Sequence, residues 1–342
     1  MLCCLWTSTL LQRQEVSIFG FLQKRVDRRN LVGIGLTDEG FAIACVSRDG
    51  DAAFTLSHTD YAEYESDTQM SQQLSAWVHA YHLKHKLTNF ALAPHQFNFV
   101  LTETPEVPDA ELVNAMRWKS KELLDMDMAE VVMDCLPIQG QKQRGRQPMA
   151  YVVAADKAVL KKYVGMIEET ELELRSIDVP AMVQRNIASL LAEDKQGVAL
   201  LNLNKHSGLL TITRDGSVYL ARDLDVGYAH FASAVVTTDD EWQVEGMPPA
   251  TQNTLDAIVL EVQRSIDYYE RYFAQPPINA LVIAPLPREV PGMVDYIASQ
   301  LGLPVRELDL NVLLELTQVM PRQQQSQCLQ AIGAALRWPI AS

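Results

Sequence analysis

The fold of this chain is decided by Leu31-Val32-Gly33-Ile34-Gly35-Leu36-Thr37-Asp38-Glu39-Gly40-Phe41-Ala42-Ile43-Ala44-Cys45-Val46. Two apolar runs flank a short polar turn, and this pattern predicts two antiparallel strands joined as a β-hairpin. The turn carries Thr37, Asp38 and Glu39. Two carboxylates that face a polyphosphate repel it by roughly 1 kcal/mol per charge pair in water, and by several in a partly dry cleft. The stretch therefore indicates the fold and argues against phosphate chemistry at the turn.

Length and composition limit the classes of function. The 342 residues, 48% of them hydrophobic, are enough for two domains or one large two-lobed domain with a sizeable core. Acidic residues outnumber basic ones by 43 to 29, for a net charge of -14, which argues against nucleic acid as the main partner. We interpret the acidity as a soluble cytosolic surface.

The five cysteines lie at positions 3, 4, 45, 135 and 328, without the spacing of zinc ligands. Cys45 and Cys135 lie in apolar, strand-like runs, so we expect buried free thiols in a reducing compartment. No stretch approaches the ~18 apolar residues of a membrane span.

Residues 1–30 are expected to form an N-terminal lead outside the folded lobes. Residues 16–25 resemble a bacterial N-terminus, so residues 1–15 are expected to lie upstream of the natural start. The rival interpretation is an amphipathic lead that touches a membrane, because Phe19, Phe21 and Leu22 lie beside Lys24 and Arg25.

The chain shows the same order of elements twice: three strands, a helix and a strand. The expected ranges are 31–37, 41–47, 52–58, 69–86 and 90–93, then 198–203, 208–213, 218–221, 252–274 and 278–284. The turn Arg214-Asp215-Gly216-Ser217 is a strong hairpin signal in the second copy. This order suits a mixed α/β sheet in each lobe. Duplication of such a ribonuclease-H-like unit predicts an actin-like, two-lobed α/β fold.

Material between the two copies predicts a small inserted subdomain at 105–148, with a helix at 110–124, a strand at 130–136 and a basic loop at 140–148. The first lobe is then expected at 31–104 and 149–195, and the second at 196–322. A C-terminal helix, 323–342, is expected to return to the first lobe.

Several other residues invite a functional interpretation. His79, His82 and His85 share a predicted helix, but no Cys or acidic motif accompanies them, so a solvated face is favoured over a metal site. Asp125 with Asp127, and residues 239–241, are interpreted as exposed acidic turns rather than catalytic pairs. Trp118 is expected in a core, with the anchoring of a docked peptide as the second interpretation.

Eight blocks resemble PilM-type type IV pilus assembly proteins, and the MshI branch of MSHA pilus biogenesis is the most similar. The resemblance covers about 30 to 338. No single block is very specific for this family, but the occurrence of all of them in the family's order is specific. The blocks are 114–122, 130–134, 151–156, 176–181, 213–216, 221–227, 261–269 and 331–337.

The residues at the family's nucleotide-binding positions depart from its pattern. Gly35 stands where the family has an aspartate, and Ala42 where it has a lysine. Asn202 and Asn204 replace the aspartate and glycine of the second phosphate loop, and an Asn cannot hold a magnesium shell by charge. The glycine-rich adenosine-side turn has become Ala284-Pro285, which has fewer N–H donors. The resemblance thus implies a degenerate nucleotide cleft made of Gly35, Thr37, Asp38, Glu39, Asn202, Asn204, Lys205, Ala284 and Pro285.

The resemblance implies a cytoplasmic scaffold without a cofactor, peripheral to the inner membrane through its partner. Similar proteins bind the extended cytosolic tail of a PilN-like bitopic membrane protein, with an Asn-Leu-Leu-Pro-like core, and act on the pilus motor ATPases indirectly. Docking is implied between the first lobe and the insertion. The candidate contacts are Met116, Trp118, Leu123, Val131 and Met133.

Two alternatives remain. One is an actin-like ATPase that still binds ATP and magnesium, since Lys205 and His206 could hold a phosphate. The other is the cytosolic domain of a type II secretion L-type protein, in which a transmembrane helix would follow the actin-like part.

Overall fold

A computed structural model of the chain describes residues 30–49, 53–121, 124, 126–138, 147–234 and 247–337. The chain divides into two compact units. The first comprises Met1–Val183, Leu314–Gln318 and Cys328–Ser342, and the second comprises Gln184–Leu313 and Val319–Gln327. Several predictions fall outside the described residues: the N-terminal lead with Cys3 and Cys4, most of the basic loop, the acidic stretch 239–241, Leu123 and Asp125.

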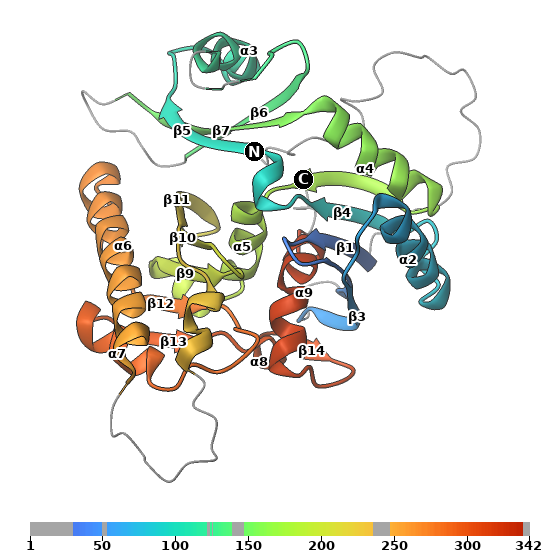
Figure 1. Cartoon of the computed structure of the whole chain (residues 1–342). Coiled ribbons are helices and arrows are strands. Elements are labelled where there is room, and N and C mark those ends of the chain that lie inside the picture. Colours follow the sequence, from blue (N-terminus) through green and yellow to red (C-terminus); the bar gives the residue numbers. More distant parts are fainter. Residues whose placement is uncertain are drawn as a thin grey trace. The chain divides into compact units, whose positions relative to one another are not determined.

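The first unit contains a six-stranded sheet in the order β14-β3-β2-β1-β4-β8 (Figure 1). Its strands β1 and β2 are buried along almost their whole length, which explains their continuous apolar runs. Helix α2 is capped by Ser66, whose side chain accepts the Gln69 N–H at 3.3 Å, and it packs on β2. The elements are β1 (Asn30–Leu36), β2 (Phe41–Ser47), β3 (Thr55–Ala62), α2 (Asp67–Ala80), β4 (Leu87–Ala91), α4 (Lys157–Glu169), β8 (Glu173–Asp178) and β14 (Glu315–Leu316).

Helix α9 (Arg322–Ala335) fastens the C-terminal part of the chain to this sheet. The Asn89 side-chain amide on β4 donates to the Ala334 carbonyl at 3.0 Å and accepts from the Ser176 hydroxyl on β8 at 2.8 Å. The buried Arg337 guanidinium pairs with the buried Asp178 carboxylate at the end of β8. Because removal of one partner would leave a buried charge unpaired, this contact fixes the end of α9 firmly.

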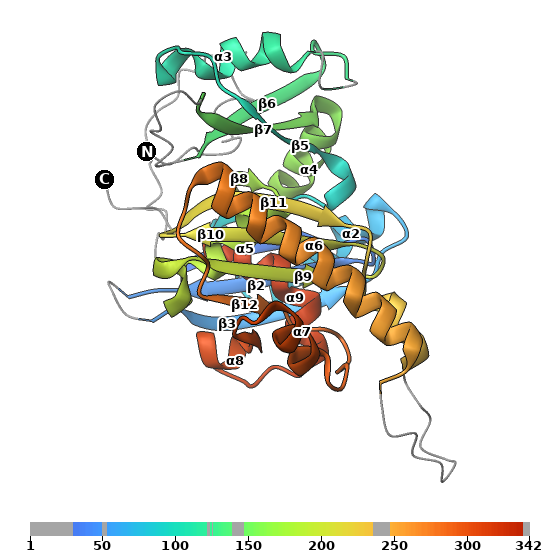
Figure 2. The same cartoon turned by 90° about the vertical axis from the view of Figure 1, so that its left-hand side faces the viewer.

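The second unit contains a five-stranded sheet in the order β11-β10-β9-β12-β13. Strands β3-β2-β1-β4-β8 of the first unit have the same order and directions, so the predicted duplication is visible in the topology. Figure 2 shows α6 lying across this sheet. The elements are α5 (Pro180–Ala188), which spans the unit boundary, η2 (Ala192–Gln196), β9 (Val198–Leu203), β10 (Gly208–Arg214), β11 (Ser217–Leu224), η3 (Tyr228–Ala234), α6 (Pro249–Phe273), β12 (Ala280–Ile283), α7 (Met293–Leu301), β13 (Val305–Glu307) and α8 (Leu310–Leu313).

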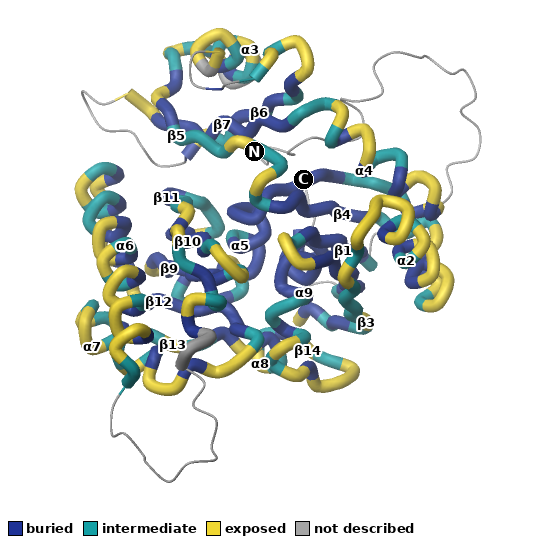
Figure 3. Tube along the Cα trace, viewed as in Figure 1, coloured by how far each residue is buried: buried dark blue, intermediate teal, exposed yellow. Residues whose placement is uncertain are grey.

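A smaller three-stranded antiparallel sheet, β5-β7-β6, also belongs to the first unit. The 3-10 turn η1 (Pro94–Gln96) leads into β5 (Asn98–Glu103), and α3 (Asp109–Ser120) precedes β6 (Val131–Pro137) and β7 (Met149–Asp156). Alternate side chains of the sheet form a core with α3, and β7 is buried along most of its length (Figure 3). Two of these strands, β5 and β7, lie outside the range 105–148.

Some elements differ from the prediction. The helix expected over 69–86 ends at Ala80, because His82 and His85 adopt left-handed backbone conformations with φ of 55° and 62°. The three histidines therefore do not share a helix face. Sequence patterning missed β5, α7 and β13. Among the described residues, no helix is long and apolar enough to cross a membrane.

Candidate functional site

The turn between β1 and β2, residues 37–40, satisfies its own backbone donors. The Thr37 hydroxyl oxygen accepts from the N–H of Glu39 at 3.3 Å and of Gly40 at 3.1 Å. The Thr37 N–H donates to the Gly40 carbonyl at 2.9 Å. In a phosphate-binding turn such N–H groups are aimed at the ligand. Here three of them, those of Thr37, Glu39 and Gly40, are already bonded within the turn.

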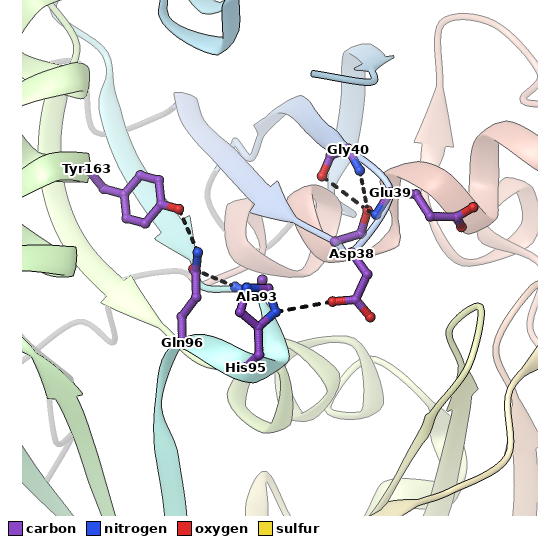
Figure 4. A network of polar contacts seen from close by, with 8 residues as sticks. Asp38, Glu39, Gly40, Ala93, His95, Gln96 and Tyr163 are labelled. Atoms are coloured by element: carbon purple, nitrogen blue, oxygen red, sulfur yellow. Dashed lines mark hydrogen bonds and ion pairs between the residues drawn. The ribbon is translucent and has the colours of Figure 1, made fainter. Parts of the chain in front are cut away.

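The carboxylate of Asp38 points to the segment that leads into the small sheet (Figure 4). It lies 3.3 Å from the His95 Nδ1 on η1. The neighbouring Gln96 accepts from the Ala93 N–H at 3.1 Å and donates to the Tyr163 hydroxyl on α4 at 2.6 Å. This polar network links the β1–β2 turn and α4 to the start of β5, so Asp38 has a structural partner of its own.

The end of β1 has no room for the carboxylate that the resemblance leads one to expect. A Cβ at position 35 would lie 2.5 Å from the Ala331 nitrogen and 2.5 Å from the Gln330 Cβ on α9. A Cβ at position 33 would lie 1.9 Å from the Ala331 carbonyl oxygen. All three distances are far below a van der Waals contact, so glycine is required wherever α9 packs this closely. The backbone of α9 occupies the place of an aspartate side chain.

The far side of the turn is closed by Tyr61 on β3. A Cβ at Gly40 would lie 2.6 Å from the Tyr61 hydroxyl oxygen. Burial and the nearby Glu39 carboxylate raise the pKa of Tyr61 to about 12, so the phenol stays neutral at physiological pH.

In the second unit the corresponding turn, residues 202–207, keeps polar side chains, but they bond to each other. The buried Asn202 amide donates to the Asn204 side-chain oxygen at 3.3 Å. The carbonyls of Asn204 and Lys205 accept from the N–H groups of Tyr228 and Ala229 at 2.8 and 2.9 Å. The turn is therefore fastened to the start of η3.

The segment after β12 is part of the apolar core. Ala284, Pro285 and Leu286 are buried, and the Ala284 N–H donates to the Leu201 carbonyl at 2.8 Å. Among the described residues, position 35 at the end of β1 has no room for a carboxylate, and position 202 on β9 carries an amide. The residues present do not fit ATP with magnesium.

The five candidate contacts for a partner have different environments. Met116, Val131 and Met133 lie in the core between α3 and the small sheet, and their side chains are buried. Trp118 was expected in a core, yet it is 80% exposed, because α3 turns Leu112 and Met116 toward the sheet. Leu123 lies outside the described residues.

The two edges of the small sheet differ in how far they are blocked. On β6, the Asp134 carboxylate accepts the Cys135 N–H at 2.8 Å, and Arg117 donates to the Val131 carbonyl at 3.4 Å. On β5, Lys119 donates to the Glu103 carbonyl at 2.7 Å. Alternate residues of a strand point their backbone N–H and C=O groups to the same side. The backbone groups of Phe99 and Leu101 therefore point away from β7, as those of Glu103 do. Among the described residues of the first unit, no protein group bonds to the outward backbone of these two.

The face of the small sheet opposite α3 carries a perturbed carboxyl group. Burial raises the pKa of Asp134 to about 6, although the Cys135 N–H and the Arg337 guanidinium act in the opposite direction. Within the described part of the chain, no group of three or more His, Cys, Asp or Glu side chains could hold a metal. Cys45, Cys135 and Cys328 are buried free thiols, as predicted for the first two.

No family model and no curated protein matches this chain. A solved structure of the PilM-PilN type IV pilus biogenesis complex is similar, with a TM-score of 0.69 and 17% identity over 91% of this chain and 98% of that chain. The fold is actin-like. Two more distant structures are a Bacteroides thetaiotaomicron protein with an actin-like ATPase fold (TM-score 0.46, 9% identity, 84% and 94% covered) and the cytoplasmic domain of EpsL of the Vibrio cholerae type II secretion system (TM-score 0.44, 10% identity, 88% and 94% covered).

Proposed function

We propose that this protein is a non-catalytic scaffold of a type IV pilus assembly platform, of the MSHA type, at the cytoplasmic side of the inner membrane. It binds the cytosolic N-terminal tail of a bitopic membrane protein similar to PilN. Through that partner it is held at the membrane, and through the platform it acts on the motor ATPases. The chain itself hydrolyses no nucleotide.

The observation that carries the proposal is the loss of phosphate-binding geometry in both units of an actin-like fold. In the first unit, α9 fills the carboxylate position at Gly35 and Thr37 bonds the turn's N–H groups. In the second unit, Asn202 and Asn204 bond to each other. A chain that keeps this fold without its nucleotide chemistry is suited to binding another protein. Similarity to PilM, solved in complex with PilN, supports the choice of partner.

The outward edge of β5 suits an extended tail. A peptide that pairs with a sheet edge gains main-chain hydrogen bonds, and its alternate side chains contact the flanking residues. On β5 the half-buried Phe99 and Leu101 supply an apolar flank, and Phe99 stacks on Tyr151 with ring centroids 4.3 Å apart. The β6 edge is less suited because Asp134 and Arg117 already bond its outward groups.

A matched pair of variants tests this site. Leu101 on β5 and Leu136 on β6 are both half-buried, and both lie opposite Tyr151 in the sheet register. We expect Leu101→Glu to weaken binding of a synthetic tail peptide with an Asn-Leu-Leu-Pro core by at least tenfold, since a charge is placed beside the added strand. Leu136→Glu should bind within about threefold of the native chain. Fluorescence anisotropy with the full chain measures both.

Equal losses in the two variants would show that the peptide lies on the sheet face and not at the β5 edge. Failure of the native chain to retain the peptide at high micromolar concentration would overturn the proposed partner. Calorimetry with Mg-ATP tests the enzymatic alternative independently, because saturable micromolar binding with turnover would contradict a non-catalytic scaffold.

A further inference from the structure

Trp118 is exposed on α3, and the side chains of the residues before and after it, Arg117 and Lys119, are held by hydrogen bonds. Arg117 donates to the Met128 carbonyl at 2.8 Å, and Lys119 donates to the Glu103 carbonyl at 2.7 Å. These bonds tie α3 to the following loop and to the end of β5. The indole between them has no ring or hydrogen-bond partner among the described residues and is 80% exposed. Burial of a large, pre-oriented aromatic side chain is the usual source of a binding hot spot.

The outward stripe of α3 has charge of opposite sign at its two ends. At 3.6 residues per turn, Glu111, Asn114, Ala115, Trp118 and Lys121 lie within about one third of the helix circumference. Glu111, Asn114, Trp118 and Lys121 are exposed, and Ala115 is half-buried. Glu111 lies in the first turn and Lys121 follows the last residue, with Trp118 and the small Ala115 between them.

We propose that this stripe is a self-association surface that binds α3 of a second copy of the chain in antiparallel orientation. A two-fold axis near Met116 places Glu111 of each copy opposite Lys121 of the other. The same axis places each Trp118 opposite Asn114 and beside Ala115 of the other copy, where a small side chain leaves room for the indole. The stripe is thus complementary to itself in both charge and shape, as a two-fold interface requires.

Other occupants fit the stripe less well. A lipid surface binds a broad apolar face with several basic residues, whereas this stripe offers one aromatic side chain and one charge of each sign, Glu111 and Lys121. The membrane-protein tail of the proposed function would pair with the edge of the small sheet, and Trp118 points away from that sheet. Self-association through α3 therefore does not depend on the proposed tail site.

The contact is expected to be weak. Two helices of 12 residues each bury less surface than the ~1,000 Å² typical of stable complexes. Association should therefore appear in the high micromolar range in solution. Fixing several copies to one membrane platform raises their effective concentration and would make the contact significant there.

Charge exchange on the full chain tests the proposal. Glu111→Lys and Lys121→Glu should each weaken self-association, because each variant juxtaposes like charges twice in the dimer. The double variant, and an equal mixture of the two single variants, should associate within about threefold of the native chain, since both restore opposite charges. Trp118→Ala should weaken association by at least tenfold. Sedimentation velocity over a concentration series measures the native chain and the five variant samples.

All substituted side chains are exposed, and circular dichroism with thermal unfolding checks that each variant folds like the native chain. A native chain that stays monomeric at every concentration would overturn the proposal. A mixture of Glu111→Lys and Lys121→Glu that fails to associate would also overturn it. Trp118-dependent flotation with vesicles of anionic lipid, without self-association, would assign the stripe to a lipid surface instead.

Discussion

The ends of β1 and β9 occupy the same place in the duplicated topology, yet they differ in what lies beside them. At β1, backbone atoms of α9 fill the space beside Gly35. At β9, polar side chains remain, and Asn202 and Asn204 bond to each other. The arrangement at β1 depends on how α9 packs, whereas the arrangement at β9 depends on two amide side chains. A single substitution can therefore restore a carboxylate only in the second unit.

Two carboxylates, the buried Asp194 of the second unit and the half-buried Asp134 of the first, differ in how many hydrogen bonds they accept. In the second unit, Asp194 accepts from the Thr213 hydroxyl at 2.7 Å and the Gly216 N–H at 2.6 Å, which fixes the β10–β11 turn. In the first unit, the Asp134 carboxylate has one such donor, the Cys135 N–H. A buried carboxylate with few donors lowers stability in its charged form.

The largest effect is expected for Gly35→Asp. The new side chain must displace the backbone of α9, so we expect the free energy of unfolding to fall by more than about 3 kcal/mol. Chemical denaturation measures it. The control is Gly165→Ala on α4, where nothing lies within 4 Å of the new Cβ and a gain of up to about 1 kcal/mol is expected. A Gly35→Asp protein as stable as the native chain would mean that α9 does not pack as described.

Asp134→Asn should stabilise the first unit near neutral pH. The folded pKa of Asp134 is about 6 and its reference value is 3.8. Between these values the native state binds more protons than the unfolded state, so stability falls as pH rises from about 4 to about 6. The variant removes this loss and should be about 1 to 3 kcal/mol more stable at pH 7, but equal to the native chain at pH 4.

Urea denaturation of both proteins from pH 4 to pH 7 checks the Asp134 prediction. Asp127→Asn, at an exposed position of the same small subdomain, serves as the control and should show little difference from the native chain. A stability difference that stays constant over this pH range would mean that Asp134 does not titrate there.

Asn202→Asp should be tolerated, in contrast to Gly35→Asp. The Asn204 amide can rotate to donate to the new carboxylate, so we expect a cost of about 1 kcal/mol. Thermal unfolding measures it, and calorimetry should detect no binding of Mg-ATP, because position 35 in the first unit is still a glycine without room for a carboxylate. A gain of nucleotide binding would show that the second turn alone limits it.

The smallest effect is expected for Thr37→Val. The substitution removes the acceptor of the Glu39 and Gly40 N–H groups at a half-buried turn, where water replaces part of the loss. A cost of about 0.5 kcal/mol follows. Ser207→Ala in the second turn is the matched control, since no side-chain bond is found for Ser207 among the described residues. A larger cost for Ser207→Ala would reverse the comparison between the turns.

Much of the architecture could be predicted from the sequence because it depends on local patterns. The apolar runs around residues 37–40 and 214–217 locate two hairpins, and periodic apolar residues locate α2 and α6. The repeated order of elements then gives the fold. The departures from the family pattern at Asn202 and Ala284-Pro285 can be read from the residue types alone. The sequence does not show why position 35 is a glycine.

The rest depends on contacts between distant segments. Nothing near Gly35 in the sequence indicates that Ala331 lies against it, since nearly three hundred residues separate them. Trp118 was expected in a core, whereas the face of α3 that packs on the sheet is set by Leu112 and Met116. Strand β5 was missed because its residues, Asn98–Glu103, show weak alternation and follow directly after another strand and a turn.

The packing of α9 on β1 has a consequence for the nascent chain. Asn89 can form its hydrogen bond only after Ala334, 245 residues later, has been synthesised, and β3 can pair with β14 only after β14 has been synthesised. By contrast, all five strands of the second sheet lie between Val198 and Glu307. Contacts this distant in sequence form slowly and leave apolar strands exposed during translation. We therefore expect the second unit to fold first on the ribosome, so the order of folding reverses the order of synthesis.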